Sequence, residues 1–235
     1  MRPTEFYDKY IWSSDDQPEE DRLRRVVRYI PAATRDLLDI GTGRGRNLRY
    51  FAKAVPEAHL CGTDVAPSVV DALASIGFEG KACDASQHVD YPDAAFDVVV
   101  AGEVIEHVVD TDTMVREFAR VLRPGGTLIL TTPNLAYLPN RLLLLAGIQP
   151  LFTETSLVKN LGRRSTLLGQ GNPVQGHLRI FTLAAARELL EMHGFQVIAT
   201  EGYRWRESGV IGAVDAVLQR VPSFAAGFIL VARTT

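Results

Sequence analysis

The sequence Leu37-Leu38-Asp39-Ile40-Gly41-Thr42-Gly43-Arg44-Gly45 joins a short apolar run to three glycines in alternate positions. The apolar run predicts a buried β-strand, and the residues from Arg46 onward predict a helix. Glycines between a strand and a helix let a ligand approach bare backbone, because they have no Cβ atom, and the first amides of the helix can bind a negative group. The stretch therefore predicts an α/β fold with a ligand site at the carboxyl end of the first strand.

The spacing of these glycines bears on which ligand the turn holds. The dinucleotide-binding form of the turn needs Gly-x-Gly-x-x-Gly or Ala, and the position three beyond Gly43 is Arg46. This departure counts against NAD and FAD. A nicotinamide-dependent reductase is kept only as an outside alternative.

Two more acidic residues come at the ends of the next two predicted strands. Asp64 stands at about the spacing from the glycine turn where a carboxylate accepts hydrogen bonds from both hydroxyls of a ribose. Asp84 ends the third strand, where its carboxylate could accept from an adenine amino group. Each acid alone is equally well explained as a strand-end or capping residue, but acids at the ends of three successive strands favour a nucleoside site.

Short apolar runs alternate with helical stretches along the chain, which is the pattern of a largely parallel sheet covered on both faces. The predicted strands are Asp36–Gly41, His59–Val65, Glu79–Asp84, Phe96–Ala101, Thr127–Thr132, Gln196–Thr200 and Phe228–Ala232. The predicted helices are Arg46–Val55, Ser68–Ile76, Thr113–Leu122 and Leu183–His193, the last with Thr182 as N-cap and Gly194 in the turn at its end. Pro124-Gly125-Gly126 is expected to be a turn that leads into the fifth strand. The pattern predicts a three-layer, doubly wound α/β fold in one domain over residues 1–235.

Two stretches interrupt the alternation. Residues 134–177 are longer than a normal connection and carry a leucine-rich piece, so we expect a cap insertion that covers the site. Residues 203–223 carry apolar residues at helical spacing and predict an amphipathic helix. Packing in the core or in a dimer explains that helix; a role at a membrane surface is the alternative, which the lack of a lysine-rich face disfavours.

Composition limits the function classes. A chain of 235 residues that is 46% hydrophobic is long enough for one large core, and its net charge of −3 gives no basic footprint for nucleic acid. No apolar run is long enough to span a membrane and no secretory leader is seen, which predicts a cytoplasmic protein. Cys61 and Cys83 are expected to be small buried side chains without chemistry. A small-molecule substrate fits best, and a homodimer is left open.

Several segments together resemble the class I, Rossmann-fold S-adenosylmethionine-dependent methyltransferases, and in particular the group like the ubiquinone-biosynthesis O-methyltransferases. The matching segments are residues 37–45, Gly62-Thr63-Asp64-Val65, Ala82-Cys83-Asp84-Ala85, residues 96–100 running into Glu103-Val104-Ile105-Glu106-His107, and residues 122–128. The resemblance implies a Rossmann-like sheet of seven strands, with an antiparallel last strand inserted beside the fifth. It also implies that Asp39 and the glycine turn surround the methionine part of the cofactor, that Asp64 holds the ribose, and that Asp84 with Ala85 borders the adenine. The cofactor-binding residues are thus predicted to be Asp39, Gly41, Gly43, Gly45, Asp64, Val65, Asp84, Ala85 and Glu103.

The methyl group of such a cofactor is already activated by its sulfonium, so the enzyme must mainly align an acceptor lone pair behind the methyl carbon. A base is needed only if the acceptor is protonated, as a hydroxyl is. This requirement makes His107 and His177 the candidate catalytic residues.

The residues Glu103, Glu106 and His107 follow the fourth strand with i, i+3, i+4 spacing, which would place all three on one face of a helix. Together with His177 they could bind a divalent metal ion such as Mg²⁺ or Zn²⁺. The Glu-x-x-Glu-His arrangement resembles the metal-binding motif of ubiquinone-biosynthesis O-methyltransferases and of small-RNA 3′-end methyltransferases. The other interpretations are that these residues only border the cofactor and cap a helix, or that a histidine is a general base without metal.

The N-terminal segment, residues 1–30, is expected to cover the cofactor. Its aromatic stretch Phe6-Tyr7-Asp8-Lys9-Tyr10-Ile11-Trp12 resembles the part that often folds over the cofactor in this family. A hydrophobic anchor for a loose terminus is the alternative.

The sequence as a whole predicts an enzyme that transfers a methyl group from S-adenosylmethionine to a small-molecule acceptor, with oxygen preferred over nitrogen or carbon. The alternative is a non-catalytic module that binds S-adenosylmethionine and acts through a partner, with the leucine-rich cap as interface. An RNA methyltransferase is disfavoured by the acidic balance of charge.

Overall fold

The computed structural model describes residues 20–206 and 208–235. Its strands are β1 (Asp36–Ile40), β2 (His59–Asp64), β3 (Glu79–Ala82), β4 (Phe96–Gly102), β5 (Leu122–Pro133), β6 (Phe195–Tyr203) and β7 (Gly227–Thr234). Its helices are α2 (Glu20–Val27), α3 (Arg46–Ala54), α4 (Ser68–Ala74), α5 (Thr111–Val121), α6 (Leu138–Leu145), α7 (Leu183–Met192) and α8 (Gly209–Leu218), with one-turn helices η1 (Ile105–His107) and η2 (Thr166–Leu168).

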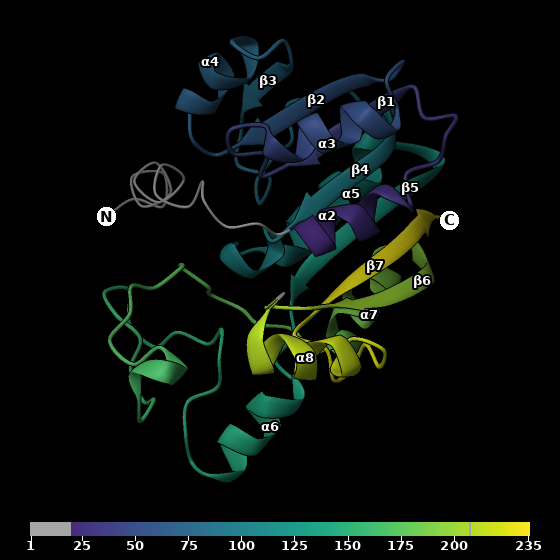
Figure 1. The fold of residues 1–235 in the computed structure, drawn as a ribbon. Coiled ribbons are helices and arrows are strands. Elements are labelled where there is room, and N and C mark those ends of the chain that lie inside the picture. The colour runs from purple at the N-terminus through teal and green to yellow at the C-terminus, as the bar shows by residue number, and fades with distance from the viewer. Residues whose placement is uncertain (1–19, 207) are drawn as a thin grey trace.

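The seven strands form one sheet in the order β3-β2-β1-β4-β5-β7-β6, drawn in Figure 1. The pairs from β3 to β5 are parallel, and β7 lies antiparallel between β5 and β6. This arrangement confirms the predicted Rossmann-like fold with its inserted antiparallel strand. The parallel strands bring their carboxyl ends to one edge of the sheet, where the sequence places the candidate site.

Both faces of the sheet are covered by helices, as the alternating side chains of β4 show. Val98 and Val100 pack in the core that α2, α3 and α4 cover, whereas Val99 and Ala101 pack in the core under α5 and α7. Successive side chains of a strand point to opposite faces, so a strand buried on both faces is apolar at every position. The three layers follow directly from this pattern.

The predicted helix ends are confirmed for α7. The hydroxyl oxygen of Thr182 accepts a hydrogen bond from the amide of Ala185 at 3.2 Å, and Gly194 has a φ of 81° after the last turn. The stretch Pro124-Gly125-Gly126, in contrast, lies inside β5. The strand already pairs at Leu122, and the register shifts before pairing resumes at Thr127, so these residues form an irregularity within the strand rather than a turn before it.

The two insertions pack together at one end of the sheet. The cap at residues 134–177 contains α6 and η2, and the stretch 203–223 contains α8. Tyr137 and Leu151 of the cap form a small apolar cluster with Ala226, and Leu143 of α6 and Leu218 of α8 pack against it. No helix in the described part of the chain is long and apolar enough to cross a membrane.

Candidate active site

The glycine turn lies between β1 and α3, and its backbone requires glycine. Gly41, Gly43 and Gly45 have φ values of 69°, 52° and 74°. A Cβ atom on Gly41 would come within 2.3 Å of Cγ2 of Val104, whereas a Cβ on Gly43 would meet nothing within 4 Å. Gly41 is therefore needed for packing, and Gly43 leaves open space beside its backbone.

Two buried carboxylates flank this open space. Asp39, in β1, is completely buried; its Oδ1 accepts a long hydrogen bond of 3.4 Å from Asn47, and its Oδ2 has no hydrogen-bond partner among the described residues. Burial raises the pKa of Asp39 to about 7. Asp64, at the end of β2, accepts from the backbone amides of Gly43 and Ala66, both at 3.1 Å. The first acid has spare acceptor capacity, and the second ties the glycine turn to β2.

The third predicted acid lies just beyond β3. The carboxylate of Asp84 accepts from the amide of Ser86 at 2.9 Å, from the hydroxyl of Ser86 at 2.6 Å and from Nε2 of Gln87 at 2.9 Å. Asp84 therefore caps its own turn, which is the structural role that its position also allowed. Ala85 beside it is buried and Val65 is half-buried. Because β3, β2 and β1 are neighbours, the three acids lie along one edge of the sheet.

Glu103 follows β4 but lies on no helix. Its φ of 57° is left-handed, and only Ile105–His107 forms a single helical turn after it. The prediction that Glu103, Glu106 and His107 share one helix face is therefore wrong, because the chain turns sharply at Glu103 before the helical turn begins. The Glu103 carboxylate accepts from the hydroxyls of Thr131 at 2.8 Å and Tyr203 at 2.6 Å.

The other three residues of the predicted metal set come together. Ligand atoms of Glu106, His107 and His177 all lie within 4.8 Å of one another, and the two imidazole rings are 4.9 Å apart. Nδ1 of His107 lies 3.2 Å from the carbonyl oxygen of Gly176, and Nδ1 of His177 lies 2.7 Å from that of Phe152. A carbonyl oxygen only accepts, so each Nδ1 carries a proton and donates it to the carbonyl.

Burial shifts the pKa values of two members of this cluster, Glu106 and His107. Burial, with the nearby charge of Glu103, raises the pKa of Glu106 well above its ordinary value. Its Oε2 accepts from the Thr132 hydroxyl at 3.0 Å, and its Oε1 has no hydrogen-bond partner in the described part of the chain. Burial and the neighbouring His177 lower the pKa of His107 to about 4. Burial therefore disfavours the charged forms of Glu106 and His107.

The cap segment that carries His177 is anchored at both sides. The carbonyl oxygen of Glu106 accepts from the amides of Leu178 at 2.8 Å and Arg179 at 3.0 Å. The Glu154 carboxylate accepts from the backbone amides of residues 175, 176 and 177, at 2.7, 2.7 and 3.0 Å. No local sequence pattern indicates this anchor, because it joins residues far apart in the chain.

Arg22 and Tyr203 also line the site, although no pattern in the sequence indicated them. Arg22 is 6% exposed and donates to the Thr131 hydroxyl at 3.2 Å, beside the end of β4. Tyr203 ends β6 and is buried, and burial raises its pKa well above the ordinary value. Both belong to segments far from β4 in the sequence. The packing of α2 against the sheet brings Arg22 there, and Tyr203 comes from the end of β6.

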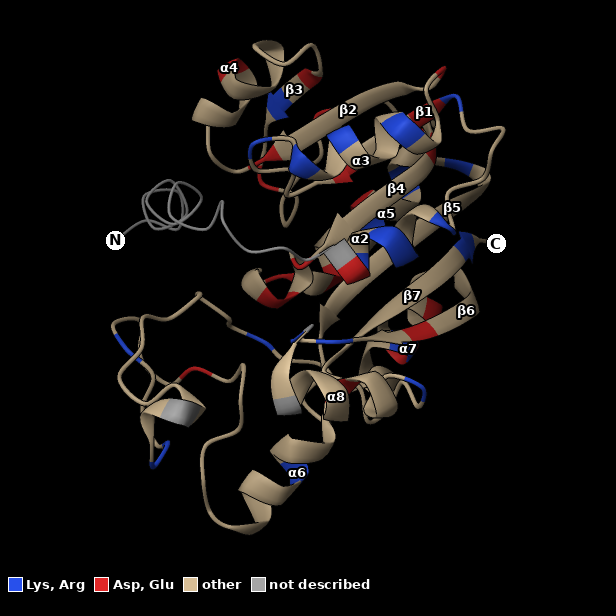
Figure 2. Ribbon diagram, viewed as in Figure 1, with Lys and Arg blue, Asp and Glu red and all other residues tan. Residues whose placement is uncertain are grey.

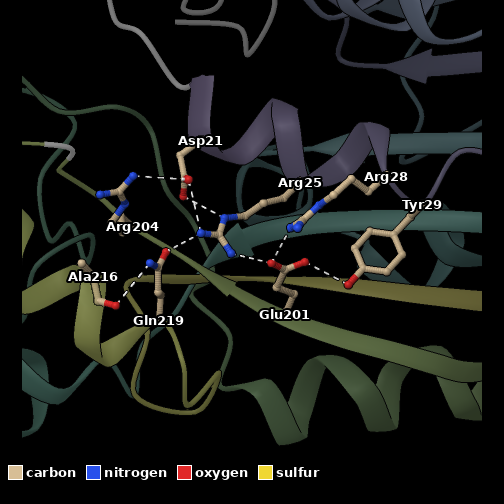
Figure 3. A network of polar contacts seen from close by, with 8 residues as sticks. All are labelled: Asp21, Arg25, Arg28, Tyr29, Glu201, Arg204, Ala216 and Gln219. Carbon is tan, nitrogen blue, oxygen red and sulfur yellow. Dashed lines mark hydrogen bonds and ion pairs between the residues drawn. The ribbon is translucent and has the colours of Figure 1, made fainter.

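A polar network fixes α2 in this position, as Figure 3 shows. Arg25 forms ion pairs with Asp21 at 2.8 Å and with Glu201 of β6, and Glu201 also accepts from Tyr29 Oη at 2.9 Å. Arg204 reaches Asp21 at 3.4 Å. Of the predicted cofactor-covering segment 1–30, residues 1–19, with the aromatic stretch, lie outside the described residues, and α2 is held against β6.

A family model described as a methyltransferase domain matches residues 16–200 of the chain. The chain is 29% identical over 163 residues to 27-O-demethylrifamycin SV methyltransferase of Amycolatopsis mediterranei (strain S699). The alignment covers 66% of this chain and 56% of that relative. It is 32% identical over 124 residues to a ubiquinone biosynthesis O-methyltransferase of Xanthomonas oryzae pv. oryzae, covering 48% and 49%. The chain thus spans about half the length of these curated relatives.

The fold is also found among solved structures. The N-methyltransferase NodS of Bradyrhizobium japonicum WM9, in complex with S-adenosyl-L-homocysteine, superimposes with a TM-score of 0.64. The match covers 100% of this chain and 99% of NodS, at 15% sequence identity. At this identity the likeness concerns the fold.

Proposed function

The chain belongs to the class I S-adenosylmethionine-dependent methyltransferases, and from that premise we propose that it transfers the cofactor's methyl group to an oxygen atom of a small-molecule acceptor. The observation that carries the proposal is the open backbone at Gly43 beside the unpartnered Oδ2 of Asp39. A ligand with a cationic group suits this place, because it supplies the partner that the buried carboxylate lacks.

The residues along the sheet edge fit S-adenosylmethionine. Asp39 and the turn at Gly41, Gly43 and Gly45 would surround the methionine part, whose ammonium group can pair with the Asp39 carboxylate. Asp64 with Val65 would hold the ribose, and Asp84 with Ala85 would border the adenine, although Asp84 must then keep or exchange its bonds to Ser86 and Gln87. The bound cofactor supplies a methyl group activated on a sulfonium. Glu103, held by Thr131 and Tyr203, borders the cofactor at the end of β4.

We assign proton acceptance from the acceptor hydroxyl to His177. A neutral imidazole with a free Nε2 lone pair can take this proton as the oxygen attacks the methyl carbon. His107, whose pKa is about 4, is a weak base at neutral pH and is better suited to position the acceptor by hydrogen bonding. The preference for oxygen rests on this pair and on the two O-methyltransferases among the relatives.

The same cluster offers an alternative, in which Glu106, His107 and His177 bind a divalent metal ion. Histidines that bind a metal through Nε2 usually donate Nδ1–H to a carbonyl or carboxylate, and both histidines here have that arrangement. Two imidazoles and one carboxylate suit Zn²⁺ better than Mg²⁺. Glu103, the fourth predicted ligand, is held instead by Thr131 and Tyr203.

Calorimetric titration of the metal-free protein with S-adenosylmethionine tests the cofactor. We expect binding by the native chain, a large loss of affinity in Asp64→Ala, and unchanged affinity in the matched control Asp71→Ala, whose side chain lies on the exposed surface of α4. NADH should not bind. Normal binding of S-adenosylmethionine by Asp64→Ala would show that the site is wrongly placed.

Methyl transfer from labelled S-adenosylmethionine to a panel of phenolic and sugar hydroxyls, with and without Zn²⁺, tests the chemistry. We expect His177→Ala to lose turnover while its cofactor affinity stays unchanged. Activity that depends on Zn²⁺ and is lost in Glu106→Gln would favour the metal. If the chain binds S-adenosylmethionine but transfers methyl to no acceptor, and activity appears only when a partner protein is added, the non-catalytic module is favoured.

A further inference from the structure

The helix α8 buries its acidic residue and exposes its apolar ones. Asp215 is 1% exposed, and its carboxylate accepts hydrogen bonds from the Tyr137 hydroxyl and from the amide of Arg206 at 3.1 Å. Ile211, Val214 and Val217 recur at helical spacing and are 46%, 46% and 62% exposed. A helix that only covered a core would bury these side chains. The core packing predicted for this helix holds for Leu218, which joins the small cluster, and not for the outward stripe.

The neighbouring helix α6 also exposes apolar side chains. Leu143 packs toward the cluster that it shares with α8, whereas Leu142, Leu144 and Leu145 are 60%, 56% and 86% exposed. Figure 1 shows α6 and α8 next to each other at the end of the molecule away from β3. Their apolar side chains therefore lie on one end of the protein.

The cap loop is joined to the chain that follows α6, because the amide of Gln149 donates to the carbonyl oxygen of Gly162 at 3.0 Å. Most of the large apolar side chains exposed in the described part of the chain come from the two insertions, including Leu157 and Val158 of the cap loop; the exceptions are Val109, Leu178, Met192 and Ile198. Isolated exposed apolar residues are ordinary, but a concentration of them marks an interaction surface. We call α6, α8 and residues 157–164 the apolar end.

The charge of the apolar end differs from that of the whole chain. The chain has a net charge of −3, yet residues 134–177 contain Arg141, Lys159, Arg163 and Arg164 against Glu154 alone. The Glu154 carboxylate is turned toward backbone amides, and Asp215 is buried. The described charged side chains that are exposed in the two insertions are all basic: Arg141, Lys159, Arg164, Arg206 and Arg220. In Figure 2 most of this end is tan, with blue segments in the cap loop and in α6.

A second copy of the chain is a poor occupant for such a surface. In a symmetric dimer the same patch meets itself, so the basic side chains of the two copies would face one another. A lipid surface with anionic headgroups complements both properties, because it accepts apolar side chains at the acyl boundary and attracts Lys and Arg.

We propose that the apolar end docks this protein on a membrane surface that contains anionic lipids. The docking is interfacial: α6 and α8 have 8 and 10 residues, and a spanning helix needs about 20. The proposal does not depend on which group the site methylates.

Flotation of the full chain with lipid vesicles tests the proposal. We expect the protein to float with vesicles of phosphatidylcholine mixed with phosphatidylglycerol, to stay behind with vesicles of phosphatidylcholine alone, and to be released by added salt. The double variant Leu145→Glu with Val217→Glu should lose flotation. Met192→Glu, at an equally exposed apolar residue on α7, should float like the native chain.

A second pair of variants separates charge from apolar contact. Lys159→Gln and Arg164→Gln should each weaken partitioning to the anionic vesicles about fivefold. Calorimetric S-adenosylmethionine binding and circular dichroism show whether each variant is folded. The proposal is overturned if the native chain does not bind anionic vesicles at low salt, if both vesicle types bind equally, or if Leu145→Glu with Val217→Glu floats unchanged. A dimer that these substitutions disrupt, without vesicle binding, would assign the surface to a second copy instead.

Discussion

The two ends of the sheet differ in which side chains they bury and which they expose. At the β1–β3 end, the apolar residues of β1 and β2 are buried, and acids lie at the strand ends near the open backbone of Gly43. At the α6–α8 end, the acid Asp215 is buried and leucines and valines face outward. The first end follows local sequence patterns. The second is held by polar contacts between distant residues, which leaves its apolar side chains available for other contacts.

The largest expected effect concerns the glycine turn. Gly41→Ala should lower the free energy of unfolding by about 4 kcal/mol, because the left-handed φ and the overlap with Val104 both cost energy. Gly43→Ala, with the same handedness but open space, should cost about 1 kcal/mol while it still weakens cofactor binding. Urea unfolding and calorimetric titration measure the two quantities. Equal stability losses in both variants would contradict the packing role of Gly41.

The next effect is a pH dependence at the same end. The pKa of Asp39 rises from an ordinary 3.8 to about 7 in the fold, so between these values the folded state holds a proton that the unfolded state has lost. The free energy of unfolding therefore falls as pH rises from about 4 to 7. Asp39→Asn should remove this slope and be more stable than the native chain by about 4 kcal/mol above pH 7. If urea unfolding shows that the free energies of unfolding of the two proteins change with pH in parallel, this prediction is wrong.

A smaller effect is expected at the opposite end. Asp215→Ala leaves the Tyr137 hydroxyl and the amide of Arg206 without their acceptor, at a cost of about 2 kcal/mol. Hydrogen exchange should quicken in α6 and α8 and stay unchanged in β1 to β3. Asp112→Ala, which removes a half-exposed partner of His193, is the matched control and should leave α6 and α8 protected. Faster exchange over the whole sheet would show that the two ends are not separate.

The smallest expected effect concerns Glu154 of the cap. Glu154→Gln weakens the hydrogen bonds that this side chain accepts from the backbone amides of residues 175–177. It should lower the free energy of unfolding by about 1 kcal/mol. We expect reduced methyl transfer at unchanged S-adenosylmethionine affinity, because only the cap side of the site is loosened. Glu188→Gln, at a residue of α7 whose carboxylate has no part in the site, is the control. A loss of cofactor affinity in Glu154→Gln would mean that the anchor also shapes the cofactor cradle.

The comparison explains how much could be predicted from the sequence. The strands and the acids Asp39 and Asp64 follow from apolar alternation and glycine spacing, which are local signals, whereas the inserted antiparallel strand was implied by the family resemblance. The helix predicted through Glu103 is absent, because a left-handed φ at a non-glycine residue has no clear sequence signature. Arg22 of α2 and Tyr203 of β6 enter the site through tertiary packing, which no local pattern indicates.

Helix α8 shows what hydrophobic periodicity cannot predict, which is the face of the helix that is buried. Val214 and Val217 correctly predicted a helix, but the same spacing was equally compatible with a buried or an exposed face. The deciding residue is Asp215, which is buried because Tyr137, far away in the chain, supplies its partner. Which face of a helix points inward depends on such contacts, and these cannot be read from the helix itself.

The anchor between the carbonyl oxygen of Glu106 and the amides of Leu178 and Arg179 has a consequence for how such an enzyme can diverge. Together with Glu154 it fixes His177 from outside the stretch between residues 155 and 173. Substitutions and changes of length in that stretch can therefore accumulate while the His177 imidazole keeps its place. Relatives that differ there can retain the same arrangement of Glu106, His107 and His177.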